Sequence, residues 1–336
     1  MMHLMREPKV SIIVLTFNSV SKLGGFFDKV LTALSNIQYS NAEILFIDNG
    51  SKDNTLTFLK RHIENNLTSK VRVIQLKRNY GWSGGNNRGA LMCKNSDYLL
   101  FLNDDVIIEP DAITELVKQF EADKSIGAAQ PLIINLDGTA YCGFDIGVAG
   151  FARPRILKKF PKETTINIFY AMGSALITRS TLFFRLGMFD EDYFYWYDDV
   201  DYCWRIRLAG FNVKCVTNAA VHHYGSATLG RENPLLSYYW VRNNILFCAK
   251  NYPLWNFILT IPLRSGEILV GGLGYSLIHR KISSVRFLMK GALDGAKDIW
   301  MFLSKKPILG KISSKHVTRY MRPDIDVELL LRWIFK

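Results

Sequence analysis

Short apolar runs alternate with helical patterns along the N-terminal third of the chain. Four runs are too short for helices, are rich in β-branched or aromatic residues and are bounded by Asn, Asp or Gly, which is typical of buried strands. They cover residues 10–17, 43–48, 71–76 and 98–102, and helical patterns fall between them at residues 21–36, 54–65 and 86–94. This alternation predicts an α/β fold whose central sheet is mostly parallel, with helices on both faces.

Past the fourth strand the pattern is less regular. A helix is predicted at residues 109–121 and strands at residues 128–134 and 211–216, whereas residues 137–168, with their Gly, Pro and basic side chains, predict no regular element. The first run, residues 10–17, follows basic residues as a signal-peptide core would, but no small-residue cleavage site comes after it. We therefore expect this run to be the first buried strand.

Polar side chains follow all four N-terminal strands. Ligands bind at the carboxyl ends of parallel strands, so these positions are candidate site residues. Turn formation and helix capping also favour Asn, Asp and Ser, and they explain Ser51 and Asp53 better than they explain the acids that end the second and fourth strands. In strand order, the candidates are Thr16, Asn18, Asp48, Asn49, Asn79, Asn103, Asp104 and Asp105.

Two segments with glycine can bring the backbone close to a ligand. Residues 79–89 (NYGWSGGNNRG) open a helix, where backbone N–H groups suit an anionic group, yet they match neither the dinucleotide-binding nor the P-loop pattern. Residues 171–180 carry Gly173 and Ser174 in an apolar stretch. Either a closely approaching ligand or tight core packing accounts for these small side chains.

Adjacent acids at the end of the fourth strand indicate metal chemistry. Hard divalent cations take carboxylate oxygens and keep positions open for phosphates, so Asp104 and Asp105 suit Mg or Mn bridging a diphosphate. Two successive histidines, His222 and His223, follow the last predicted strand. Histidines in this position are either structural or metal ligands.

Residues 189–210 (FDEDYFYWYDDVDYCWRIRLAG) contain six carboxylates. A solvated acidic turn is one explanation; the other is chemistry, because crowded carboxylates raise one another's pKa unless a cation or a helix N-terminus compensates. The pattern predicts a helix that carries an Asp201–Arg205 pair and ends at Gly210. Asp198 and Asp199 lie at the start of this helix, where the helix dipole favours the ionised carboxylate that a general base needs. The other acids, Asp190, Glu191 and Asp192, are expected to lie in a loop without an assigned role.

The net charge of +12 is concentrated at the C-terminal end, where residues 236–336 hold 16 basic and 6 acidic side chains. These basic residues are interleaved with Trp, Phe, Leu and Ile, and no nucleic-acid module is recognisable. We therefore expect an anionic membrane surface as a partner, and no nucleic acid. Five scattered cysteines without a paired spacing indicate buried thiols in a reducing compartment.

Two segments of this tail indicate contact with a membrane. Residues 254–278 are apolar but contain Pro262, Arg264 and Glu267, so they fall short of the roughly 18 uncharged residues of a spanning helix and predict a re-entrant or interfacial segment. Residues 281–303 predict a basic amphipathic helix, which lies either on a membrane or against the rest of the protein. Its apolar stripe comprises Ile282, Val285, Met289, Leu293, Ala296, Trp300 and Leu303.

In their order and spacing these segments resemble family 2 glycosyltransferases of the GT-A fold, most closely the rhamnosyltransferase-like branch of bacteria and archaea. The resemblance covers residues 8–245, which are expected to form the catalytic domain, followed by residues 246–336 as a membrane-associated helical tail. It rests on VSIIVLTFN, FIDNGSKDNT, NYGWSGGNNRG, LNDD, GSALITRS, the acidic stretch and AVHHYGS taken together.

The resemblance implies roles for individual residues. Asp105 would be the metal-binding end of the family's DxD motif, His223 would complete the metal site, and Asp199 would be the catalytic base. Asn103 stands where many relatives carry the first Asp, and Asp104 would take over part of that role. The other implied donor contacts are Thr16, Asn18 and Asp48 to the base and ribose, and Asn79, Gly81, Gly84, Gly173, Ser174 and Trp196.

The implied reaction is an inverting single displacement, in which Asp199 takes the proton of an acceptor hydroxyl and Mg or Mn neutralises the departing diphosphate. The donor would be a dTDP-, UDP- or GDP-sugar and the acceptor a glycan or polyprenyl-linked glycan, at the cytoplasmic side of the cell membrane; a homo-oligomer is left open. The same motifs also fit a polyprenyl-phosphate sugar synthase or a nucleotidyltransferase. A non-catalytic glycan-binding protein is the alternative from a different class.

Overall fold

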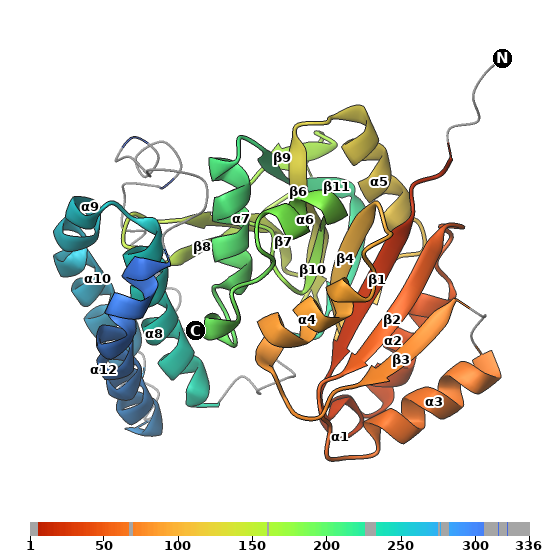
Figure 1. The fold of residues 1–336 in the computed structure, drawn as a ribbon, viewed down its shortest axis with the longest axis horizontal. Coiled ribbons are helices and arrows are strands. Elements are labelled where there is room, and N and C mark those ends of the chain that lie inside the picture. Colours follow the sequence, from red (N-terminus) through yellow and green to blue (C-terminus); the bar gives the residue numbers. More distant parts are fainter. Residues whose placement is uncertain are drawn as a thin grey trace.

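The computed structural model describes residues 6–66, 70–159, 161–225, 233–274, 276, 282–305, 315 and 321. One half of its sheet is the predicted parallel series, in the order β3 (Val71–Gln75), β2 (Ala42–Asp48), β1 (Val10–Thr16) and β4 (Tyr98–Asn103) (Figure 1). Thr16 pairs with Asp48, and Leu15 pairs with Asn103. The polar residues that end these strands therefore meet at one edge.

The other half of the sheet is mixed, so the prediction of a mostly parallel sheet is wrong. Strand β10 (Ala175–Arg179) runs antiparallel between β4 and β6 (Ile126–Asn135). Strand β11 (Asn212–His223) is parallel to β6, and β5 (Val106–Ile108) is antiparallel to β11. The apolar pattern locates each strand but carries no information on its direction, which long-range pairing decides.

Residues 137–168 contain three strands, where the sequence predicted irregular structure. Strands β7 (Ala140–Ile146) and β8 (Ala152–Leu157) form a hairpin on the edge of β6, and β9 (Thr165–Asn167) pairs with β11. The β7–β8 pairing is interrupted by a register shift between Tyr141 and Phe144, and β8 contains a proline. Both features break the alternating pattern from which strands are recognised.

Helices cover both faces of the sheet. Neighbouring residues of β1 belong to different hydrophobic clusters. Ile12 lies in a cluster with residues of α2 (Gly25–Ser35) and α5 (Ala112–Ala122). Ile13 lies in a cluster with residues of α4 (Gly81–Leu91) and α7 (Asp198–Leu208). This is the predicted arrangement, because successive side chains of a strand point to opposite faces. The other helices before β11 are α1 (Ser19–Leu23), α3 (Thr55–Asn66), α6 (Ser180–Arg185) and the 3₁₀ turn η1 (Glu191–Tyr193).

Helix α4 begins at Gly81, five residues before the predicted start, so most of the glycine-rich segment is helical and buried. Gly81 has φ of 74°, and a Cβ there would lie 2.3 Å from the carbonyl oxygen of Phe194. Its nitrogen is held by the Asn79 side chain. The absence of side chains thus lets α4 pack against the segment that precedes α7.

The C-terminal helices gather on the side of the molecule opposite β3 and α3 (Figure 1). They are α8 (Leu235–Asn251), α9 (Leu254–Leu259), α10 (Ile261–Glu267), the π-helical η2 (Ile268–Gly274) and α12 (Ile282–Ser304). The predicted domain boundary at residue 245 therefore falls inside α8. Within the described ranges, no helix has the length and apolar character that crossing a membrane requires.

Helix α12 packs along α8 with one face and exposes another. Gly291 allows the close approach, since a Cβ there would lie 2.4 Å from the carbonyl oxygen of Tyr238 on α8. On the opposite face, Met289, Leu293 and Trp300 of the predicted apolar stripe are exposed. The predicted packing is therefore present, and the membrane contact that the sequence offered as the alternative stays a prediction. The side chain of Ile282 and nearly all of the tail beyond residue 305 lie outside the described residues.

The tail also neutralises the acids that the sequence left without a role. Lys250 on α8 lies 2.9 Å from carboxylate oxygens of both Asp190 and Asp201, and Lys305 at the end of α12 contacts Asp190 and Asp192. The predicted Asp201–Arg205 pair is present at 2.9 Å. Burial raises the pKa of Asp201, but the charges of Lys250 and Arg205 outweigh it and hold that pKa at about 2. Much of the acidic stretch is therefore structural.

Candidate active site

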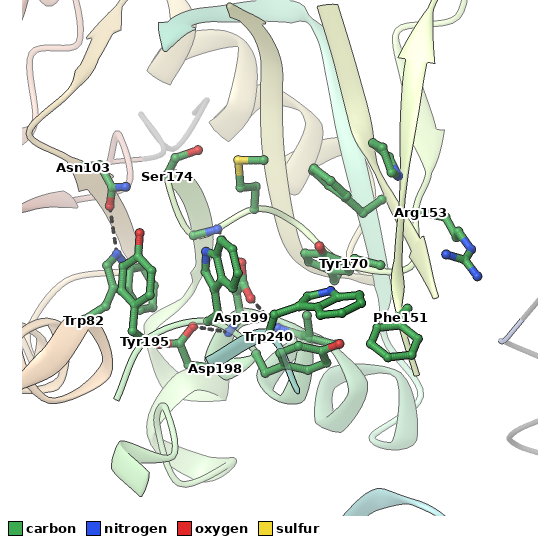
Figure 2. Close-up of a pocket in the computed structure, with 18 of the residues that line it drawn as sticks. Trp82, Asn103, Phe151, Arg153, Tyr170, Ser174, Tyr195, Asp198, Asp199 and Trp240 are labelled. Atoms are coloured by element: carbon green, nitrogen blue, oxygen red, sulfur yellow. Dashed lines mark hydrogen bonds between the residues drawn. The ribbon is translucent and has the colours of Figure 1, made fainter. Parts of the chain in front are cut away.

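A cavity of about 440 Å³ opens at the carboxyl end of β4 and extends past the start of α7 toward β8 and α8 (Figure 2). It brings together seven residues predicted from the sequence. In Figure 2, Asn103 and Ser174 lie at one end, Asp198 and Asp199 lie in the middle, and Phe151 and Arg153 lie at the other end. The seven predicted residues are Asn103, Asp105, Gly173, Ser174, Trp196, Asp199 and His223.

The two aspartates at the start of α7 are held in place by hydrogen bonds. The Oδ2 atom of Asp199 accepts from the Gly173 N–H at 2.9 Å, and its Oδ1 atom accepts from the Val200 N–H at 2.8 Å. Asp198 accepts from the Ser83 hydroxyl at 2.7 Å. The preceding Trp196 has φ of 67°, a costly conformation for a residue with a side chain. This turn aims α7 and its two acids at the cavity.

Burial dominates the protonation of both acids. It raises the pKa of Asp199 to about 6, although the N–H groups of Gly173 and Val200 lower it. Burial and the neighbouring Asp199 charge raise the pKa of Asp198 to about 7, against the lowering effect of the Ser83 hydroxyl. Burial thus outweighs the backbone N–H groups, including those of the first turn of α7, that favour the ionised form of Asp199. A carboxylate with a pKa near neutrality suits a general base.

Asp105 and His223 form the candidate metal pair. The Nε2 atom of His223 lies 3.4 Å from Oδ1 of Asp105, because β11 pairs with β5 directly after Asp105. Two ligands at about 2.1 Å from one cation stand roughly this far apart. Among the described residues, no third His, Cys, Asp or Glu joins them. The pair therefore fits a divalent cation that takes its other ligands from a diphosphate and water.

His222 lies outside the cavity and contacts Glu109 at 2.8 Å. It precedes His223 on the same strand, so the two rings point to opposite sides. Asp104 is also turned away from the cavity, accepts a hydrogen bond from Ser19, and has a pKa raised to about 7 by burial and by Asp105. Each adjacent pair is thus divided into one cavity residue and one structural residue, by strand β11 for the histidines and by the turn between β4 and β5 for the aspartates.

The other predicted donor residues form a network around the first three strand ends, outside the cavity lining. Thr16 is fully buried and donates to the Ile47 carbonyl at 3.4 Å. Asn18 accepts from the Lys52 N–H at 2.7 Å, and Asn79 accepts from the Asn49 amide at 3.0 Å. The buried Oδ2 atom of Asp48 has no hydrogen-bond partner within the described structure. Gly81 and Gly84 are buried in α4. The donor roles of these residues stay predictions.

Many lining residues were not singled out from the sequence, among them Trp82, Arg153 and Glu267. The indole N–H of Trp82 donates to Asn103 Oδ1 at 2.8 Å and so fixes the amide that replaces the usual acid. Asp198, which the sequence places at the helix start together with Asp199, also lines the cavity. Arg153 and Glu267 lie far apart in the chain, and nothing local marks them.

Comparison with known proteins decides the family. The model of "Glycosyl transferase family 2" matches residues 11–183, just over half of the chain. The chain belongs to glycosyl transferase family 2. It is therefore a glycosyltransferase, as the strand-end motifs predicted.

Relatives and solved structures agree with this assignment. The chain is 24% identical over 298 residues to the low-salt glycan biosynthesis hexosyltransferase Agl10 of Haloferax volcanii, covering 86% of this chain and 91% of that protein. It is 27% identical over 237 residues to the N-acetylglucosaminyl-diphospho-decaprenol L-rhamnosyltransferase of Mycobacterium tuberculosis, covering 62% and 75%. The mannosyltransferase PcManGT of Pyrobaculum calidifontis, solved with GDP-Man and Mn²⁺, superposes with a TM-score of 0.53 at 14% identity, covering 90% and 84%. The GT-A fold is thus confirmed.

Proposed function

We propose that the protein is an inverting, metal-dependent transferase that moves a sugar from a nucleoside-diphosphate sugar to a hydroxyl of a glycan. One observation carries the proposal: a single cavity contains a buried carboxylate with a pKa near neutrality, Asp199, together with the Asp105–His223 pair. Base and cation ligands in one cavity are what a single displacement at an anomeric carbon needs.

Different side chains of the cavity have different roles in the proposed reaction. Asp199, held by two backbone N–H groups, accepts the proton of the acceptor hydroxyl. Asp105 and His223 would hold a Mg or Mn ion, whose charge stabilises the leaving diphosphate. The Trp82–Asn103 hydrogen bond and the backbone around Gly173 shape the wall beside them. An acceptor placed beyond Asp199 attacks from the side opposite the diphosphate, which inverts the anomeric centre.

The names of the relatives support a rhamnosyl- or hexosyltransferase of glycan biosynthesis in the cell envelope. The mycobacterial relative's name specifies a decaprenol-linked acceptor, which supports a polyprenyl-linked glycan here. A dTDP-, UDP- or GDP-sugar is the proposed donor.

A panel of dTDP-, UDP- and GDP-sugars with Mn²⁺ tests this function. We expect the purified protein to release nucleoside diphosphate from one donor class, and to release it faster when a glycan acceptor is present. Release that requires a lipid phosphate, with no effect of any glycan, would instead identify a polyprenyl-phosphate sugar synthase. Absence of turnover and of donor-induced thermal stabilisation with every donor would reject catalysis.

We also propose that the C-terminal helices bind the cytoplasmic surface of an anionic membrane. Leu293 and Trp300 on α12 are 62% and 81% exposed, and Trp255 on α9 is 73% exposed. Lys290 and Lys297 of α12 are exposed as well, and both contact Asp294 on the same helix. Exposed large apolar residues beside basic ones are typical of interfacial helices.

Flotation with vesicles containing phosphatidylserine tests membrane binding. Deleting the tail is an unsuitable test, because Lys250 and Lys305 form ion pairs with acids of residues 190–201 and their loss would disturb the catalytic domain. We expect Leu293→Glu with Trp300→Glu to lower vesicle binding about tenfold or more, since each buried side chain contributes roughly 1.5–3 kcal/mol. Leu136→Glu, at a residue 60% exposed on the catalytic domain, is the matched control. Equal binding by both variants would contradict the proposal.

A further inference from the structure

The end of the cavity beyond Asp199 is built from aromatic rings. Phe151 and Trp240 lie with centroids 4.7 Å apart, and Phe144 and Tyr170 are stacked at 5.0 Å. These rings come from β7, the turn before β8, the loop before β10 and helix α8, and all four line the cavity. Figure 2 shows Phe151, Tyr170 and Trp240 on the side of Asp199 away from Asn103. The aromatic end thus lies where an acceptor would approach the base.

A buried ion pair closes this end. The Nη2 atom of Arg153 on β8 lies 2.7 Å from Oε2 of Glu267, the last residue of α10. Their side chains are only 8% and 4% exposed, and both line the cavity. The buried Nε atom of Arg153 has no hydrogen-bond partner among the described residues. An unsatisfied buried donor is costly, so a ligand that accepts from it gains affinity.

The charges of the cavity restrict the ligand. Arg153 is the one Lys or Arg among the described residues that line the cavity, and Glu267 neutralises its charge. The remaining ionisable groups in the lining are the three aspartates Asp105, Asp198 and Asp199, together with His223 and tyrosines. Apart from the ion proposed at Asp105 and His223, whose charge the departing diphosphate would take up, the cavity therefore offers a phosphate nucleophile no unpaired cation among its described lining residues. An uncharged, hydroxyl-rich ring avoids repulsion by the aspartates, packs its apolar face on the aromatic rings and offers oxygen atoms to Arg153.

We propose that this aromatic end is the acceptor subsite, that it takes an uncharged pyranose, and that Glu267 is a positioning residue that orients Arg153 toward it. The inference rests on the proposed transferase function and names the acceptor of that same site. The C-terminal helical region is then part of the active site as well as a membrane-facing surface, because α8 supplies Trp240 and α10 supplies Glu267. The acceptor for the Asp199-assisted step is a sugar hydroxyl, and the proton passes from that hydroxyl to Asp199 as the glycosidic bond forms and the bond to the diphosphate breaks.

The test compares acceptor kinetics with nucleotide binding. Acceptor KM is measured with a panel of neutral p-nitrophenyl pyranosides and with p-nitrophenyl glucuronide, and nucleoside diphosphate with Mn²⁺ is titrated by calorimetry. For the wild type we expect transfer to a neutral pyranoside and weaker use of the glucuronide. For Glu267→Gln we expect the KM of the neutral acceptor to rise about tenfold or more, with the nucleotide Kd unchanged, because a site built to bind a hydroxyl loses most when its donor is misplaced.

Asp145→Asn is the matched control. Asp145 pairs with Arg155 at 2.7 Å on the same β7–β8 hairpin, but neither residue lines the cavity. The control should leave the acceptor KM within about twofold of wild type. If Glu267→Gln fails to fold, Arg153→Met with Glu267→Met removes both charges at similar volume, and it should show the same loss in acceptor KM.

Three results would overturn the inference: preference for the glucuronide, an unchanged acceptor KM in Glu267→Gln, or a parallel change in acceptor KM and nucleotide Kd. Failure of the underlying function looks different. In that case the wild type transfers to no pyranoside although it binds nucleotide.

Discussion

Asp199→Asn is expected to lower kcat by on the order of 10²-fold or more, the usual scale for a lost general base. The same substitution should raise the thermal stability of the protein. Burial raises the pKa of Asp199 from 3.8 to about 6, so the folded state binds more protons than the unfolded state between those values. Folding stability therefore falls as pH rises through that window, and at pH 7 the ionised carboxylate is destabilising. Removing its charge relieves roughly 1–3 kcal/mol of this cost. The amide offers one acceptor oxygen to the two N–H groups, so about 1 kcal/mol of hydrogen bonding is lost against that gain.

Turnover and thermal unfolding of the same sample measure both effects. The wild-type rate should fall about tenfold per pH unit below pH 6, as Asp199 becomes protonated. The gain in unfolding temperature of Asp199→Asn should shrink as pH is lowered through the window from 6 to 3.8 and vanish below it, where the wild-type carboxyl is neutral in both states.

Asp201→Asn is the matched control on the same helix. Its carboxylate is bound by Lys250 and Arg205, and its pKa is held at about 2, so the same chemical change should lower the unfolding temperature at pH 7. Near wild-type turnover in Asp199→Asn would remove Asp199 from the role of base. Loss of activity with a lowered unfolding temperature would attribute the loss to structure.

Asp105→Ala is expected to abolish metal-dependent donor binding. The carboxylate is one of two protein ligands available in the cavity, and removal of even an outer-shell partner of a metal site costs 10–100-fold in affinity. We therefore expect the Kd for nucleoside diphosphate with Mn²⁺ to rise by more than about 100-fold, to the value measured with EDTA. Calorimetry with and without Mn²⁺ measures the difference.

Asp104→Asn is the control for this substitution. Asp104 adjoins Asp105 in the sequence, but its carboxylate accepts from Ser19 and faces away from the cavity. This variant should keep its metal-dependent binding. Equal Mn²⁺-dependent affinity in Asp105→Ala and the wild type would exclude Asp105 as a ligand.

The local sequence pattern determined a large part of the fold and the location of the candidate site. The four parallel strands, the polar residues that end them and the helix that begins at the aspartates all follow from periods of two and 3.6 residues and from turn chemistry. A parallel series brings its strand ends to one edge, so the placement of Asn103 and Asp105 in one region was predictable before any contact was known.

Tertiary structure alone decided the rest. The direction of β10 and the β7–β8 hairpin depend on long-range pairing, which leaves no local period. The roles of Asp190, Asp192 and Asp201 depend on lysines in α8 and directly after α12, and the raised pKa of Asp199 depends on its burial. The Arg153–Glu267 pair joins residues 114 positions apart. The sequence by itself determined which chemistry the chain carries; packing decided which carboxylates are buried, paired or open to the cavity, because desolvation and ion pairing act between residues that only the folded chain brings together.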